Sequence, residues 1–342
     1  MTGVFIDAAM DLIQVPTPDR QTAIKGLIDA QEIAFSYGLT TVDDAGLEQA
    51  TIELIDSLQQ EEELKIRMYA MVSATQKNLD YYINKGIIKT DRLHVRSFKI
   101  YGDGALGSRG AAMRKSYSDR HNHFGALIYS PERYREMAKQ IAASEYQMNT
   151  HAIGDSANTW ILKTYEEFLK GKQNRRWRIE HAQIISKDDF RLFENVLPSI
   201  QPTHATSDMY WAENRIGKDR MKGAYAYKDL LKVYGKVALG TDFPVEQVNP
   251  FLTFYAAAVR KDTEGFPKGG FQIENVLSRE ETLKGMTIWA AFSNFEESEK
   301  GSIEVGKLAD FVILNQDIMT IEEDRIPTTK ATATYINGEK VY

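Results

Sequence analysis

Short β-rich segments alternate with longer amphipathic segments along most of this 342-residue chain, and no other feature limits its fold as strongly. The seven short segments span residues 40–44, 66–72, 94–101, 147–152, 177–182, 198–202 and 236–241. Segments between them have helical patterning, and several begin with Ser, Thr, Asp or Pro as helices do: 51–63, 131–145, 157–170 and 186–195. This alternation predicts an α/β fold with a parallel sheet, either a barrel or a doubly wound sheet.

The rhythm changes after residue 242. A helical segment is expected at 282–293, and two strand-like stretches follow within 301–342. Asn337-Gly338, between alternating apolar residues, predicts a tight hairpin because both residues tolerate positive φ. We therefore expect a barrel domain over residues 1–300 and a small C-terminal β element over 301–342.

Charge and cysteine content narrow the functional classes. Lys and Arg total 42 and Asp and Glu total 48, so the net charge of −6 offers no general field for nucleic acid or anionic lipid. With no cysteine, disulfide scaffolds, thiolate zinc sites and cysteine nucleophiles are excluded. Any metal must be held by His, carboxylate or a modified Lys. The acidic start, and the lack of about 18 consecutive apolar residues, predict a soluble cytoplasmic protein without membrane contact.

Ionisable residues follow five of the expected strands, each at the C-terminal end: Lys99, His151, His181, His204 and Asp242. In an α/β barrel this end carries the active site, so separate strands would bring these groups into one pocket. Taken singly, each histidine could be structural, and Asp242 could be a turn former. The agreement of five strands favours a shared site. An ammonium cannot bind a metal, so Lys99 needs burial or conversion to a carbamate.

Several sequence blocks carry a family resemblance. They are FKIYGDGALGSRGAAM from Phe98, NTHAIGDSAN from Asn149, RIEHAQ from Arg178, SIQPTHATSD from Ser199, LGTDFPVEQVNP from Leu239 and GSIEVGKLADFVIL from Gly301. In this order, over nearly the whole chain, they resemble the amidohydrolase superfamily. The resemblance is to its YtcJ-like branch, amidohydrolase family 3, which includes N-substituted formamide deformylase.

The resemblance implies a TIM-type (β/α) barrel with a metal site at its mouth. Lys99 would be carboxylated and bridge two divalent ions, and His151 and His181 would bind the second ion. Asp242 would touch the first ion and pass the proton of the hydrolytic water. Imidazole and carboxylate ligands suit zinc and also permit manganese or iron. The implied activity is hydrolysis of a C–N bond in a small amide- or formamide-like substrate.

Further residues are expected around the substrate and beneath the site. His204 and Arg109 match family positions in the loops around the substrate, and Trp211 either lines an apolar substrate pocket or packs. The glycines at 102–107 are expected to allow a tight turn beneath the site, with phosphate binding as a weaker alternative. Glu180 is expected to point away from the pocket, because neighbours on a strand face opposite sides.

One departure from the family is informative. Family members carry a His-X-His pair at the end of the first barrel strand, after several sandwich strands, and this sequence opens downstream of both. His121-Asn122-His123 lacks an apolar strand before it and is interpreted as a solvated loop. We therefore expect a shortened member without the first barrel strand, closed by a second polypeptide, by self-association or by local rearrangement. The rival hypothesis is a catalytically impaired remnant, or half of a split enzyme, acting as a binding or scaffold chain.

Overall fold

The computed structural model describes residues 3, 5, 7–13, 15–170 and 173–342, so part of the acidic opening segment lies outside the described residues. The strands are β1 (Thr41–Leu47), β2 (Arg67–Ser73), β3 (Ile88–Lys89), β4 (Leu93–Tyr101), β5 (Gln147–Ala152), β6 (Arg178–His181), β7 (Leu197–Ile200), β8 (Ala238–Leu239), β9 (Phe311–Leu314), β10 (Ala331–Ile336) and β11 (Glu339–Lys340). The α-helices are α1 (Arg20–Ser36), α2 (Gln49–Gln60), α3 (Gln76–Lys85), α4 (Pro131–Ala142), α5 (Asp155–Leu169), α6 (Pro202–Asp208), α7 (Ala212–Met221), α8 (Tyr227–Tyr234), α9 (Pro250–Val259), α10 (Arg279–Met286) and α11 (Ile288–Ser293). Short 3₁₀ helices are η1 (Asp7–Leu12), η2 (Gln173–Arg175), η3 (Lys187–Asn195), η4 (Ile273–Asn275) and η5 (Glu323–Thr328).

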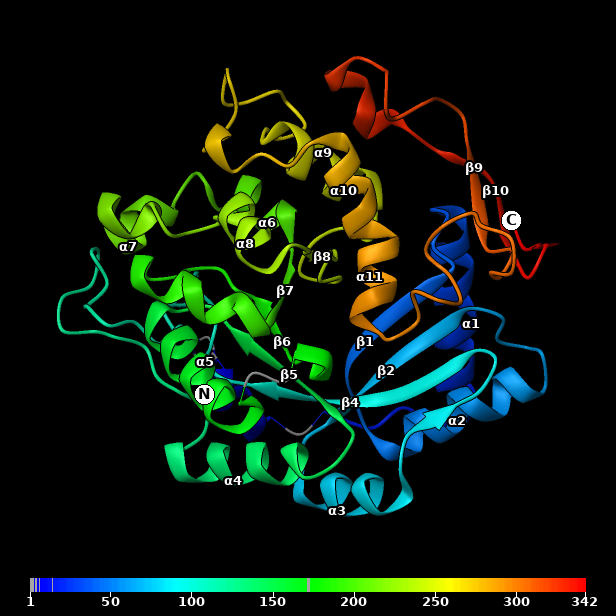
Figure 1. The fold of residues 1–342 in the computed structure, drawn as a ribbon, viewed down its shortest axis with the longest axis horizontal. Coiled ribbons are helices and arrows are strands. Elements are labelled where there is room, and N and C mark those ends of the chain that lie inside the picture. The colour runs from blue at the N-terminus through cyan, green and yellow to red at the C-terminus, as the bar shows by residue number, and fades with distance from the viewer. Residues whose placement is uncertain (1–2, 4, 6, 14, 171–172) are drawn as a thin grey trace.

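The main sheet is a curled, parallel half barrel. Its strands follow the order β1-β2-β4-β5-β6-β7-β8, and each neighbouring pair on this path is parallel. The short β3 adds to β4 in the antiparallel sense. Helices cover the outer side of the curl (Figure 1). The prediction of an α/β fold is confirmed, and each of the seven expected strands is present.

The central strands are buried on both faces, as expected for a parallel sheet between helices and a filled interior. On the inner side Tyr69 donates to Gln147, with 2.9 Å between the oxygens. On the outer side the hydroxyls of Tyr134 and Tyr165, from α4 and α5, lie within 2.9 Å of the Thr150 hydroxyl. These contacts fix β5, which carries His151, against the helices behind it.

The interior of the half barrel is crossed by a buried arginine. Arg178, at the start of β6, donates to Asp43 on β1 at 3.2 Å and to the Ser293 hydroxyl at 2.9 Å. Asn294 donates to the other oxygen of Asp43 at 2.6 Å. The chain just after α11 thus connects the β6 and β1 sides of the curl.

Two expected helices differ from the structure. The segment at 282–293 is interrupted at Thr287 (φ −126°, ψ −95°), which separates α10 from α11. The Thr287 hydroxyl donates to the Leu283 carbonyl at 2.6 Å, a side-chain bond of the kind that bends helices. The segment at 186–195 forms the 3₁₀ helix η3 (Lys187–Asn195).

The C-terminal strands form a separate antiparallel sheet in the order β11-β10-β9. The predicted hairpin is confirmed, with φ of 50° at Asn337 and 77° at Gly338. This sheet contacts the start of the chain: the Thr334 hydroxyl donates to the Phe35 carbonyl at 2.7 Å. The Arg67 guanidinium pairs with Asp310 at 2.5 Å, and both side chains are almost fully buried.

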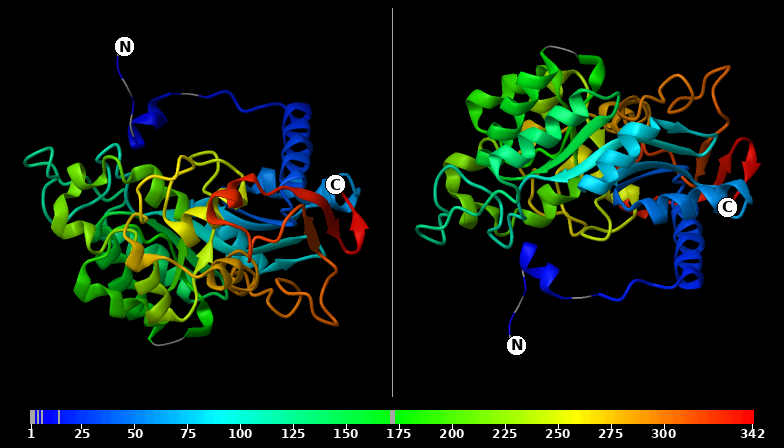
Figure 2. Two further views of the ribbon diagram at one scale, coloured as in Figure 1. Left: turned by 90° about the horizontal axis from the view of Figure 1, so that it is seen from above. Right: turned by 90° about the horizontal axis from the view of Figure 1, so that it is seen from below.

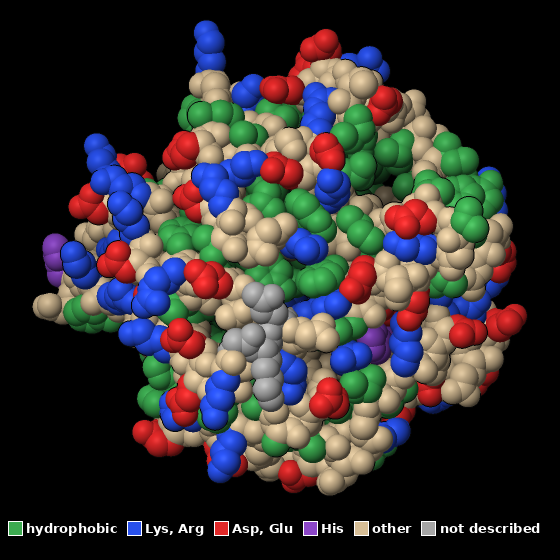
Figure 3. All heavy atoms as spheres, viewed as in Figure 1, with side chains coloured by type: hydrophobic (Ala, Val, Ile, Leu, Met, Phe, Trp, Pro, Cys, Tyr) green, Lys and Arg blue, Asp and Glu red, His purple; other side chains and the backbone are tan. Residues whose placement is uncertain are grey.

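Beside this sheet, α1 projects from the body of the molecule (Figure 2). Only the last part of α1 contributes buried residues besides Gln31. On the face in Figure 3, acidic and basic side chains are interspersed. Among the described residues, no helix combines the length and apolar character needed to cross a bilayer.

Candidate metal centre

The five strand-end residues meet at one edge of the half barrel. Lys99 is near the end of β4, His151 is in β5 and His181 ends β6. His204 lies in α6, directly after β7, and Asp242 follows β8. Because the strands are parallel, their C-terminal ends share this edge.

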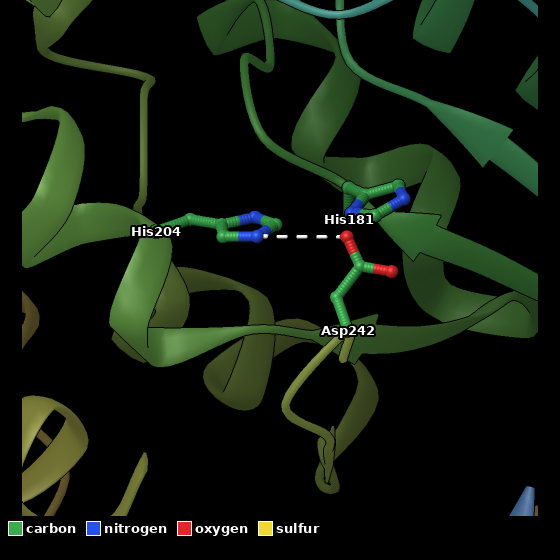
Figure 4. Close-up of side chains that lie close together, drawn as sticks. All are labelled: His181, His204 and Asp242. Atoms are coloured by element: carbon green, nitrogen blue, oxygen red, sulfur yellow. Dashed lines mark ion pairs between the residues drawn. The ribbon is translucent and has the colours of Figure 1, made fainter. Parts of the chain in front are cut away.

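Two histidines and an aspartate form the centre of this group (Figure 4). One ligand atom from each of His181, His204 and Asp242 can be chosen so that the three lie within 4.8 Å of one another. His204 Nε2 is 3.6 Å from an oxygen of Asp242. The His181 and His204 rings are stacked, with 5.7 Å between their centres. The His151 ring meets His181 edge-on at 4.5 Å, so it joins the same cluster.

Lys99 borders the cluster. Its Nζ lies 3.8 Å from the centre of the Tyr101 ring. Burial lowers the pKa of Lys99 to about 8, although the charges of Glu180 and Asp242 oppose this shift. A buried amine with this pKa spends an appreciable fraction of its time unprotonated near neutral pH.

The histidines of the cluster are neutral at neutral pH. Burial, followed by the charge of Lys99, lowers the pKa of His151 to about 3. Burial and the neighbouring His151 hold the pKa of His181 well below its usual range, and burial lowers the pKa of His204 to about 4. Each of these rings has a buried nitrogen that finds no hydrogen-bond partner among the described residues. Neutral imidazoles with unpartnered nitrogens are suited to bind a cation.

The backbone is unusual at two cluster residues. His181 (φ 76°) and Asp242 (φ 59°) both adopt the left-handed region. Such conformations are sparsely populated for residues other than glycine and are concentrated at functional sites. At His181 the change of backbone direction interrupts the alternation of β6.

The expectation that Glu180 points away from the pocket is wrong. Its carboxylate lies 3.1 Å from the Arg178 guanidinium in the interior, and its charge raises the pKa values of Lys99 and Asp242. Arg178 and Glu180 lie two positions apart on β6, so both side chains face the inside of the curl. The left-handed conformation of His181 then brings its ring to the same cluster.

The glycine-rich segment after β4, expected to form a tight turn, packs closely against β5 at Gly102. The Gly102 amide donates to the His151 carbonyl at 2.8 Å. A Cβ atom at Gly102 would lie 2.5 Å from the Ile161 side chain and 2.7 Å from the His151 carbonyl oxygen. Only glycine allows this approach.

The three residues expected near the substrate, His204, Arg109 and Trp211, have different surroundings. His204 is part of the cluster itself. Arg109 makes two hydrogen bonds to Asp119, at 3.1 and 2.8 Å, which ties the loop after β4 to itself. Trp211 precedes α7, and its ring lies 3.5 Å from the position a Cβ would take at Gly107. Roles for Arg109 and Trp211 in substrate binding stay predictions.

The two histidines of the 121–123 loop have different surroundings. His121 is exposed, and the Nε2 atom of His123 lies 2.9 Å from the Arg109 carbonyl oxygen.

One neighbour of the cluster was missed from the sequence, although a signal was available. Tyr101 lies two positions after Lys99 on β4 and so faces the same side of the sheet.

Comparisons with known proteins identify the family to which the chain belongs. Residues 2–342 match the model of a family described as "Amidohydrolase family". The chain is 30% identical to Protein LONG AFTER FAR-RED 3 of Arabidopsis thaliana, an alignment covering 100% of this chain and 61% of that protein. It is 31% identical to Putative amidohydrolase YtcJ of Bacillus subtilis (strain 168), covering 72% of this chain and 47% of that protein. N-substituted formamide deformylase of Arthrobacter pascens is 22% identical, with coverages of 71% and 44%.

The chain thus spans between 44% and 61% of the length of these relatives. Among solved structures, an uncharacterized metal-dependent hydrolase from Pyrococcus horikoshii OT3 superposes with a TM-score of 0.81 at 26% identity. That match covers 94% of this chain and 68% of the Pyrococcus chain. The resemblance inferred from the sequence blocks is confirmed, and the chain belongs to the amidohydrolase family.

Proposed function

We propose that this chain belongs to a metal-dependent hydrolase that cleaves a C–N bond in a small amide- or formamide-like substrate. The observation that carries the proposal is the cluster of His181, His204 and Asp242, with ligand atoms within 4.8 Å of one another at the strand ends. The family match and the name of the Arthrobacter relative support a C–N substrate class.

The residues present fit a divalent cation. Within the part of the chain that the structure describes, the buried His204 Nε2 and His181 Nδ1 atoms have no hydrogen-bond partners, and Asp242 adds a carboxylate oxygen. Two imidazoles and a carboxylate suit zinc, with manganese or iron as alternatives. We propose His181, His204 and Asp242 as ligands, with Lys99 and His151 available for a second ion. Such an ion would supply Lewis acidity toward the hydrolytic water and the substrate carbonyl.

Asp242 is proposed as the proton carrier. Burial raises its pKa to about 6, and the charge of Lys99 only partly offsets this. A bound cation would lower this pKa, so the proposal rests on the position of the carboxylate, which can accept a proton from the hydrolytic water and return it to the leaving amine. An oxygen of Asp242 lies 3.6 Å from Nε2 of His204, so the proton transfer would take place beside a proposed metal ligand.

Lys99 is proposed to act as a carbamate. Its buried, partly unprotonated nitrogen could attack CO₂ and release one proton, which would convert a cation into an anionic ligand. Tyr101 lies over the Lys99 nitrogen, at 3.8 Å, and would border the modified side chain.

Metal content and hydrolysis test the proposal together. We expect chain purified without chelator to hold at least one equivalent of zinc, manganese or iron by elemental analysis, and to hydrolyse N-formyl or N-acyl amines. His181→Ala is expected to weaken metal binding by more than about 100-fold, since even partners outside the ligand shell contribute 10 to 100-fold. His123→Ala, in the loop beside Arg109, is the matched control and should keep the metal. Wild-type chain with neither metal nor hydrolysis would instead favour the non-catalytic rival.

The open side of the sheet supports a proposal about partners. β1 and β8 end the strand path, and the middle of β1, at Asp43 to Ala45, is exposed, whereas β6 is buried. Exposed edge strands present unpaired backbone groups. We propose that the sheet is part of a (β/α) barrel and that a second copy or a partner polypeptide covers this side. If self-association covers it, light scattering of the purified chain should give a mass above that of one chain. A monodisperse monomer that resists limited proteolysis would contradict both self-association and the need for a partner polypeptide.

A further inference from the structure

Asp103 is a fully buried carboxylate in the turn after β4. One oxygen accepts hydrogen bonds from the amides of Ala112 and Gly154, both at 2.8 Å, and the other accepts from the amide of Ile153 at 3.0 Å. These amides belong to the loop after β4 and to the turn that joins β5 to α5. Three fixed donors leave the carboxylate little freedom to rotate.

The same carboxylate faces a histidine of the cluster. Oδ1 of Asp103 lies 3.6 Å from Nε2 of His151, and this nitrogen is buried with no standard hydrogen bond to any residue that the structure describes. The His151 ring also meets His181 at 4.5 Å, so it lies between Asp103 and the proposed ligands. A neutral imidazole carries one N–H group and one lone pair. A proton held on Nε2, facing the carboxylate, leaves the lone pair on Nδ1.

We propose that Asp103 is a positioning residue for His151: it holds the proton on Nε2 and thereby presents Nδ1 as a metal ligand. The inference rests on the proposed metal site and assigns no step of hydrolysis to Asp103. Histidines that bind metals commonly donate their other N–H to a carboxylate, which fixes both the tautomer and the orientation of the ring.

An asparagine would reverse this effect with little change in shape. In Asp103→Asn, the amide oxygen would take the position that accepts from Ala112 and Gly154. The amide nitrogen would then face Nε2 of His151 with its N–H groups, and the Ile153 amide would lose its acceptor. Two donors cannot face each other, so the proton of His151 would move to Nδ1.

A matched control is available in the same region. Asp155, at the start of α5, is also buried and accepts a hydrogen bond from the Arg114 amide at 2.8 Å. Asp155→Asn removes a buried charge from the same region, keeps an oxygen that can accept from the Arg114 amide, and leaves the carboxylate opposite His151 unchanged.

The experiment measures two quantities. Long-range ¹H–¹⁵N correlation spectra of metal-free protein report the tautomer of His151, and equilibrium dialysis with Zn²⁺ reports metal affinity. We expect the Nε2–H tautomer in the wild type, and in Asp103→Asn the Nδ1–H tautomer with 10 to 100-fold weaker zinc binding, as is typical for loss of such a partner. Asp155→Asn should retain the wild-type tautomer and affinity.

The outcomes separate this inference from the proposed function. Wild-type chain with the proton on Nδ1, or equal losses of affinity in the two variants, would overturn the role of Asp103. Wild-type chain that binds no zinc would overturn the proposed function. The wild-type tautomer would still decide the role of Asp103, and that measurement does not depend on whether either variant folds.

Discussion

Asp242→Asn is expected to lower kcat for hydrolysis of an N-formyl or N-acyl amine by about 10²- to 10⁴-fold, the usual contribution of a general acid–base group. An amide in this position cannot accept a proton from water or return one to the leaving amine. Its oxygen can still face His204 across the 3.6 Å gap. Steady-state kinetics measure the effect, and metal content determined on the same sample shows how much of the loss comes from weaker metal binding.

Asp229→Asn is the matched control for this substitution. Asp229 lies on α8 with about half of its side chain accessible to solvent (48%), and it pairs with Lys232 at 2.8 Å. Its replacement should leave kcat unchanged. An Asp242→Asn enzyme with full metal content and nearly wild-type kcat would refute the proposed role of Asp242 as proton carrier.

Arg178→Met is expected to lower the free energy of unfolding by about 3–5 kcal/mol, the range measured when one partner of a buried ion pair is removed. The Arg178 side chain is only 1% exposed and lies 3.2 Å from Asp43 and 3.1 Å from Glu180. Methionine fills much of the volume, but it leaves the buried Glu180 carboxylate without its cation. Urea unfolding at neutral pH measures the change.

Arg135→Met provides the comparison for an exposed ion pair. Arg135 pairs with Glu167 at 2.6 Å, and nearly half of each side chain is accessible to solvent. Exposed pairs contribute about 0–1 kcal/mol, so this variant should unfold at almost the wild-type urea concentration. Equal destabilisation by the two substitutions would show that the buried network around Arg178 has no special contribution to stability.

The strands and the residues at their ends could be predicted because parallel strands in a covered sheet leave a strong local pattern. Buried strands such as β2 are short and largely apolar, and in the more polar β4 and β5 the ionisable Lys99 and His151 stand near the strand ends. Lys99, His151, His181 and Asp242 were identified in this way. Their meeting follows from topology, since parallel strands bring their C-terminal ends together.

Features that depend on backbone dihedrals or on distant contacts could not be predicted. The positive φ of His181 interrupts the alternation of β6, so Glu180 and His181 both face the cluster. No local pattern marks this conformation in a residue other than glycine. The position of His204 beside Asp242 depends on how α6 leaves β7, over a separation of 38 residues. From the sequence alone, His204 is therefore expected near the substrate and not among the proposed metal ligands.

The buried pair of Arg67 and Asp310 affects how the protein can fold during synthesis. Asp310 leaves the ribosome 243 residues after Arg67, and Asn337, which also accepts from that guanidinium at 2.6 Å, emerges later still. Until then the arginine has no carboxylate partner and stays in water, because an unpaired charge resists burial. The nascent β2 region should therefore settle into its final place only after Asp310 and Asn337 have been synthesised.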